Sequence, residues 1–191
     1  MKKLVFAIII ISIGFGQRLS TKNGGGLNVG DRGAGLFYHR HIKSYDNIKL
    51  GATIRWFDVR PSEEIPSYNY YTGQYENKNT VSLAIFPLFG VVNYYPFEGK
   101  IANNFSPFIS AKLGPVLVLD ADESIDSFTE RWFNAKGKFT YGGNIAVGVE
   151  FRQPGKIHYS IEFSYDLIPL SSTTDGYTNL NGTVLSFSIH R

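Results

Sequence analysis

One stretch near the C-terminal end, residues 157–167, constrains the fold more than any other part of the chain. Successive side chains of a β-strand point to opposite faces. One face here carries Ile157, Tyr159, Ile161, Phe163, Tyr165 and Leu167, and the other carries His158, Ser160, Glu162, Ser164 and Asp166. A helix would spread the two carboxylates around its circumference, so the period of two predicts a strand. The apolar face meets the core in a soluble β-protein and meets lipid in a membrane barrel.

The composition supports β structure in a single domain. The chain has 191 residues, with 12 Tyr, 15 Phe, 20 Gly and only 18% charged residues, a mixture that favours strands. Cysteine is absent, which excludes disulfides, thiolate metal sites and cysteine nucleophiles. The net charge is +3 and the basic residues are spread along the chain, so we predict no nucleic-acid partner.

The N-terminus predicts export. Two lysines precede a nearly unbroken apolar run over residues 4–13, and the small residues Gly14 and Gly16 follow, which is typical of a cleaved signal peptide. The run is shorter than the roughly 20 residues that a spanning helix needs, although an N-terminal anchor helix is the alternative. The expected division is a signal peptide at 1–16, a glycine-rich lead-in or first strand at 17–30, and a β-barrel at 31–191.

The connections between the predicted strands alternate in length. Short connections are expected at 43–47, 98–104 and 153–156, and longer ones at 60–79, 120–136 and 169–178. Outer-membrane barrels have an even number of strands, short periplasmic turns and longer extracellular loops. Seven strands can be recognised directly, so an eighth is expected between Gln17 and Gly30. The sequence therefore predicts an all-β, antiparallel up-and-down transmembrane β-barrel, most consistent with eight strands.

The two faces of the predicted strands differ in charge. The polar faces carry the cations Lys49, Arg55, Lys112 and Arg152 and the anions Glu150, Glu162 and Asp166. An eight-stranded barrel has room inside for little more than side chains, so these charges should neutralise one another as a lumen network. The opposite faces are almost uncharged. Aromatic residues on them should form girdles at the membrane interfaces, and the expected members are Tyr38, Trp56, Tyr95, Tyr141 and Tyr165.

Two adjacent segments carry a family resemblance. Residues 85–97 contain Pro87, Gly90 and the pair Tyr94-Tyr95, and residues 105–114 begin Phe-Ser-Pro-Phe and end in glycine. These segments resemble small bacterial outer-membrane β-barrel proteins, over roughly residues 30–191. The resemblance implies an outer-membrane location, contact with outer-membrane lipid and lipopolysaccharide, and insertion by the barrel assembly machinery. It brings no catalytic signature and no cofactor.

His158, Ser160 and Glu162 are the strongest candidate for catalysis, because they share one strand face. Outer-membrane lipid A deacylases use a histidine, a serine and an acid on barrel strands, and the spacing here is similar. However, neighbours on one face lie about 7 Å apart, too far for direct proton transfer, and this face points into the lumen. We therefore predict a hydrogen-bonded lumen network that includes His158 and Ser160, with the acids Glu162 and Asp166 paired with nearby cations, and no catalytic site.

His39 and His41 also share a face and could bind a metal. Arg40 lies between them, and no carboxylate or thiolate is near in sequence, so the signal for a metal site is weak. The preferred interpretation is that both are polar lumen residues near the periplasmic end. No metal ligand is predicted.

The long connections contain aromatic residues among polar ones: Tyr68, Tyr70, Tyr71, Tyr75 and Trp132. Exposed aromatics suit contact with an extracellular partner, whereas the alternative is that the loops pack over the barrel mouth. The sequence thus favours a structural or surface-interaction role. A narrow pore or small-molecule conduit, a lipid-modifying enzyme and a soluble lipocalin-like barrel are the alternatives.

Overall fold

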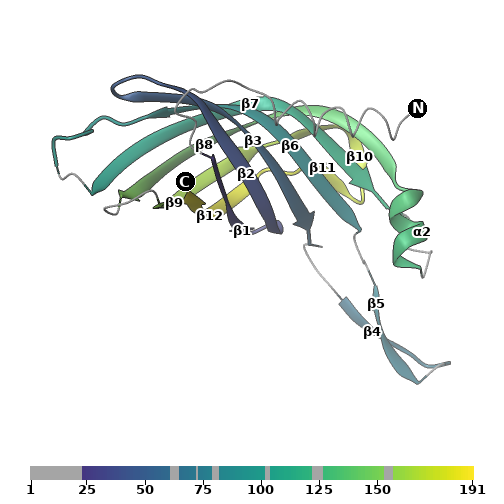
Figure 1. The fold of residues 1–191 in the computed structure, drawn as a ribbon. Helices are drawn as coiled ribbons and strands as arrows, with labels where there is room; N and C mark the ends of the chain where they lie inside the picture. The colour runs from purple at the N-terminus through teal and green to yellow at the C-terminus, as the bar shows by residue number, and fades with distance from the viewer. Residues whose placement is uncertain are drawn as a thin grey trace.

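Eight antiparallel strands close into a barrel in the computed structural model, which describes residues 23–60, 65–71, 73–78, 82–101, 104–121, 127–152 and 157–191 (Figure 1). The barrel strands are β1 (Asn23–Gly30), β2 (Gly33–Ser44), β3 (Ile48–Val59), β6 (Leu83–Tyr94), β7 (Phe105–Asp120), β8 (Lys136–Arg152), β9 (His158–Leu167) and β12 (Gly182–His190). Their order around the barrel is β1-β12-β9-β8-β7-β6-β3-β2. The glycine-rich β1 is the eighth strand, and it closes the barrel by pairing with both β2 and β12. The predicted signal peptide at 1–16 lies outside the described residues.

Three extensions project from one end of the barrel. The β4 (Ile65–Asn69) and β5 (Gln74–Lys78) hairpin extends beyond the wall, and the short helix α2 (Phe128–Phe133) lies at the same end (Figure 1). The strands β10 (Pro169–Thr174) and β11 (Tyr177–Asn179) form the third extension. Outer-membrane barrels have their longer connections at the extracellular end and their shorter ones at the periplasmic end, so the end with the extensions is named the extracellular end and the opposite one the periplasmic end. Among the described helices, none has the length and hydropathy to cross a membrane.

The outer wall of the barrel is apolar. Ile161 and Phe163 are 42% and 56% exposed on β9, whereas the alternate residues Ser160 and Ser164 are buried. The same alternation runs around the barrel, with exposed outer residues that include Leu27, Val29, Leu36, Ile54, Leu88, Val92, Ile109, Leu113, Ile145, Val147, Leu185, Phe187 and Ile189. A water-soluble barrel would turn such side chains inward. The wall therefore has the surface that lipid requires.

Tyr95 departs from the expected aromatic girdle. Four of its predicted members do lie on the outside, namely Tyr38, Trp56, Tyr141 and Tyr165. Tyr95 is only 2% exposed, and its phenol donates a hydrogen bond to Glu150 Oε2 at 2.7 Å inside the barrel. The prediction failed because β6 is apolar on both faces, so alternation of polarity does not show which face meets lipid.

The outward position of Phe163 generates a test of the membrane assignment. Replacing Phe163 with Arg places a charge near the middle of a lipid-facing strand, and we expect a loss of about 2–4 kcal/mol in the free energy of unfolding. Urea-induced unfolding in lipid vesicles measures this loss. Tyr71→Arg, in the fully exposed hairpin tip, is the matched control and should change the stability little. Equal stability of the two variants would contradict a lipid-facing Phe163.

Candidate functional site

The lumen is divided into two layers. The extracellular half is filled by apolar side chains, although the sequence predicted a polar filling throughout. The buried members of this apolar layer are Phe57, Val59, Leu83, Ile85, Phe89, Val116, Val118, Ile168, Tyr177, Leu180 and Val184. Eight of them come from barrel strands, and Ile168, Tyr177 and Leu180 come from the connection between β9 and β12.

That connection is fixed across the barrel mouth by hydrogen bonds. The backbone N–H of Leu180 donates to the carbonyl of Ile168 at 2.8 Å. The phenol of Tyr177 donates to the carbonyl of Arg60 at 3.1 Å, and the Arg32 guanidinium lies 5.3 Å from the centre of the Tyr177 ring. These contacts satisfy polar groups at the mouth and leave the apolar side chains to fill it.

The other half of the lumen holds an ionic network. Arg55 Nη2 lies 2.5 Å from Asp166 Oδ2, and both side chains are almost fully buried. Asn144 Nδ2 donates to the other oxygen of Asp166 at 2.7 Å. Lys112 and Glu162 form a second ion pair. Each carboxylate here has a charged or amide donor, as a buried anion requires.

Glu150 is the centre of the network at the periplasmic end. It is 2% exposed and accepts hydrogen bonds from Lys49 Nζ and Tyr95 Oη, both at 2.7 Å. Arg152 Nε lies 3.2 Å from its Oε1, and His158 Nδ1 lies 2.9 Å from the same atom. Four side chains from four separate parts of the wall thus converge on one carboxylate.

Arg152 extends this network to the periplasmic turn between β6 and β7. Its guanidinium binds both carboxylate oxygens of Glu98, with Nη2 at 2.8 Å from Oε2. Burial alone would raise the pKa of the Glu98 carboxyl, but the hydrogen bonds and charge of Arg152 outweigh it and hold that pKa below its usual value. The turn is therefore held to the barrel by a charged, bidentate contact.

His158, Ser160 and Glu162 share a lumen face, but each has a different partner. His158 contacts Glu150, Glu162 pairs with Lys112, and Ser160 Oγ lies 2.5 Å from Ser188 Oγ and 2.9 Å from His190 Nε2. No hydrogen bond joins the three to one another within the described contacts. The structure thus places them in three separate parts of the lumen network, without a relay from acid to histidine to serine.

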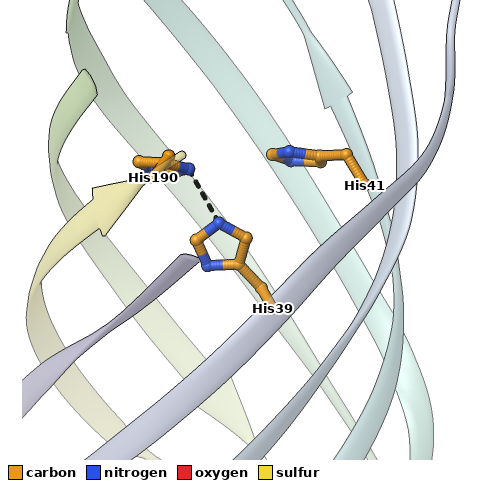
Figure 2. A group of neighbouring side chains, drawn as sticks. All are labelled: His39, His41 and His190. Atoms are coloured by element: carbon orange, nitrogen blue, oxygen red, sulfur yellow. Dashed lines mark hydrogen bonds between the residues drawn. The ribbon is translucent and has the colours of Figure 1, made fainter. Parts of the chain in front are cut away.

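A cluster of three histidines lies beside this network, in the part of the lumen near the chain's C-terminal end (Figure 2). His39 and His41 come from β2, and His190 comes from β12. His39 Nε2 lies 2.7 Å from His190 Nδ1, and one nitrogen from each ring lies within 4.8 Å of the others. Sequence analysis paired His39 with His41 but missed His190, because only closure of the barrel brings β12 close to β2.

The predicted loop residues lie at the extracellular end. Tyr70 and Tyr71 are 88% and 101% exposed at the tip of the β4–β5 hairpin, and Tyr68 is 43% exposed. The rings of Tyr68 and Tyr70 meet edge to face at 5.2 Å between centroids. Trp132 is half-buried on α2, and the side chain of Tyr75 lies outside the described residues.

Known structures with the same architecture were found by comparison of folds. The crystal structure of Neisserial surface protein A superposes with a TM-score of 0.58 and 9% sequence identity, covering 89% of this chain and 93% of that one. The N-terminal β-barrel domain of Pseudomonas aeruginosa OprF superposes with a TM-score of 0.53 and 9% identity, covering 91% of this chain and 98% of that one. The fold is that of the small outer-membrane barrels. No protein-family model matches the chain, and no curated protein matches it in sequence.

The buried ion pair between Arg55 and Asp166 generates a double-mutant test. Asp166→Leu leaves the Arg55 guanidinium buried without its carboxylate, and Arg55→Met leaves the carboxylate without its cation. Each single change should cost about 3–5 kcal/mol in the free energy of unfolding, whereas the double replacement should recover most of that loss. Urea titration of the refolded barrel in lipid measures all three variants. Additive losses in the double variant would show that the pair is not coupled.

Proposed function

We propose that this protein is a closed outer-membrane barrel that acts at the cell surface through its extracellular extensions and does not conduct ions. The observation that carries the proposal is the apolar layer across the extracellular half of the lumen. Leu83, Val116 and Val118 are fully buried within it. Ions cross a pore only where it is filled with water or where polar groups of the protein replace the hydration shell. An apolar constriction offers neither.

The ionic half of the lumen also argues against a conducting pore. Conducting pores keep charged side chains available to water and to the passing ion. Here Lys49, Arg55 and Lys112 are each held by a carboxylate across the lumen. Arg55 and Lys112 line a cavity of about 60 Å³, and Phe89 and neighbouring apolar residues bound this cavity on its extracellular side. A cavity that is bounded on this side supports an enclosed chamber in the lumen and argues against a channel that crosses the barrel.

A surface role is supported by the extensions. The β4–β5 hairpin presents Tyr70 and Tyr71 almost completely to solvent, well beyond the end of the barrel (Figure 1). Tyrosine gives a large, amphipathic contact area at a small cost in side-chain entropy. These side chains suit contact with a partner at the cell surface, such as surface polysaccharide or another protein.

Conductance in planar lipid bilayers tests the closed lumen. We expect the wild-type barrel to insert without stable unitary current steps, because the apolar layer blocks the path of hydrated ions. A general porin measured in the same membrane is the positive control, and insertion is checked by recovery of folded protein from the bilayer lipid. Reproducible unitary steps from the wild-type protein would contradict the proposal and favour the narrow pore.

Cysteine labelling on intact cells tests the orientation, because the chain has no cysteine of its own. Tyr71→Cys at the hairpin tip should react with a membrane-impermeant maleimide on intact cells. Asp46→Cys, in the exposed turn between β2 and β3, is the matched control and should react only after the outer membrane is permeabilised. The reverse pattern would place the tyrosine hairpin on the periplasmic side and remove the surface role.

A further inference from the structure

Three of the four histidines in the chain converge in the lumen, although they come from distant parts of the sequence. His39, His41 and His190 are each less than 10% exposed. Their ring centroids lie 4.3 Å apart for His39 and His190, and 5.2 Å apart for His39 and His41. Figure 2 shows the three rings around a common space, with a hydrogen bond between His39 and His190.

A missing side chain makes this convergence possible. Gly24 of β1 lies between the two strands that carry the cluster, and it is in register with His39 on one side and with His190 on the other. A Cβ atom at Gly24 would lie 2.5 Å from Cε1 and Nε2 of His39. The glycine thus leaves the space in which imidazoles from β2 and β12 meet across β1.

We propose that His39, His41 and His190 bind a divalent transition-metal ion of the zinc type inside the barrel, with a further coordination position facing the lumen cavity. Imidazole is a preferred ligand for Zn²⁺, Cu²⁺ and Ni²⁺. At a Zn–N distance of about 2.0–2.1 Å, two nitrogens of a tetrahedral site lie about 3.4 Å apart. His39 Nε2 and His190 Nδ1 lie 2.7 Å apart, and one nitrogen from each of the three rings lies within 4.8 Å of the others, so the separations bracket this value and the rings must rotate to reach the tetrahedral geometry.

Neighbouring side chains can hold the rings in the protonation state that a metal needs. Both His39 Nε2 and His190 Nδ1 must present lone pairs to the ion, so in the bound state the ring proton of His39 lies on Nδ1 and that of His190 lies on Nε2. That nitrogen lies 2.9 Å from Ser160 Oγ and 2.9 Å from Ser188 Oγ, either of which can accept the hydrogen bond. Contacts of this kind fix the tautomer of metal-binding histidines.

Asn93 plays the corresponding part for His41. Its amide group lies against His41, with Nδ2 at 3.3 Å from Nε2, and its Oδ1 is buried without a hydrogen-bond partner. The two ends of an amide are interchangeable in such an assignment. With the amide turned over, Oδ1 would accept a hydrogen bond from Nε2–H of His41, and the lone pair of Nδ1 would then be the one offered to the ion.

The charges around the cluster allow a cation. Arg55 and Lys112 line the same cavity as the histidines, and each is already paired with a carboxylate. Glu150 and Glu162 line the same cavity as the three histidines. A divalent ion at the cluster would thus lie in a lumen whose positive charges are compensated. The proposal rests on the lumen alone and is independent of the surface role proposed above.

Titration of untagged, refolded protein in detergent tests the site. We expect Zn²⁺ to bind with one-to-one stoichiometry by calorimetry and to raise the thermal unfolding temperature. Co²⁺ alone should give visible absorption bands of a low-coordinate nitrogen site, and Zn²⁺ should displace it. Absence of saturable binding by the folded wild-type protein would overturn the proposal without reference to any variant.

Single replacements assign the ligands. His39→Gln, His41→Gln and His190→Gln should each weaken Zn²⁺ binding by roughly 100-fold or more, and Gly24→Val should also weaken it by displacing the His39 ring. His158→Gln is the matched control, because His158 is the fourth histidine, is equally buried in the lumen and contacts Glu150. It should change the affinity less than about threefold. Heat-modifiable migration on gels confirms that each variant is folded. Equal losses in His158→Gln and the folded cluster variants, or full affinity in all of the latter, would overturn the assignment.

Discussion

The charged groups in this lumen lie inside a closed barrel whose outer wall is apolar, so each needs its counter-charge within the barrel. The network follows from that constraint. Glu150 collects donors from Lys49, Tyr95, Arg152 and His158, because a carboxylate that is 2% exposed has no bulk water to hydrate it. Breaking such a pair costs far more than the same change on a solvated surface, because the remaining charge is left buried. The pairs across the lumen therefore fix how opposite parts of the wall face one another.

Apolar side chains fill one half of the barrel interior and paired charges fill the other half. Strand β6 contributes to both halves. The lumen face of this strand is apolar over Leu83, Ile85 and Phe89, and the same face continues through Asn93 to Tyr95 in the polar half. Apolar side chains pack near the mouth because the connection between β9 and β12 adds its own apolar residues there. At the other end, the described parts of the short turns add no residue to the buried apolar cluster, and charged side chains fill the space. The division of the lumen thus follows the unequal lengths of the connections at the two ends.

The sequence predicts the architecture better than it predicts the lumen. Strand β9 could be assigned outright, since its polar and apolar faces differ at every residue. The side chains of Arg55, Glu150 and Asp166 are buried in the structure, and a charge on a strand that is otherwise apolar indicates the inward face. Tyr95 was misplaced because β6 carries apolar residues on both faces. The apolar layer at the mouth could not be foreseen from Ile168 or Leu180, since a long connection has no period that shows which side chains fold inward.

The closing strand explains why the histidine cluster escaped sequence analysis. Strand β1 faces the lumen with Gly24, Gly26, Asn28 and Gly30, and its glycines have no side chains that could show an alternating pattern. Their absence is what allows the barrel to close tightly. A Cβ atom at Gly24 would press on the His39 ring, and one at Gly26 would clash with the backbone carbonyl of Phe187 on β12. The glycines that make β1 hard to recognise in the sequence therefore also allow β12 and β2 to pack closely on either side of it. This packing brings His190 of β12 to His39 and His41 of β2. A site assembled in this way is set by register across the closure and not by spacing along the sequence.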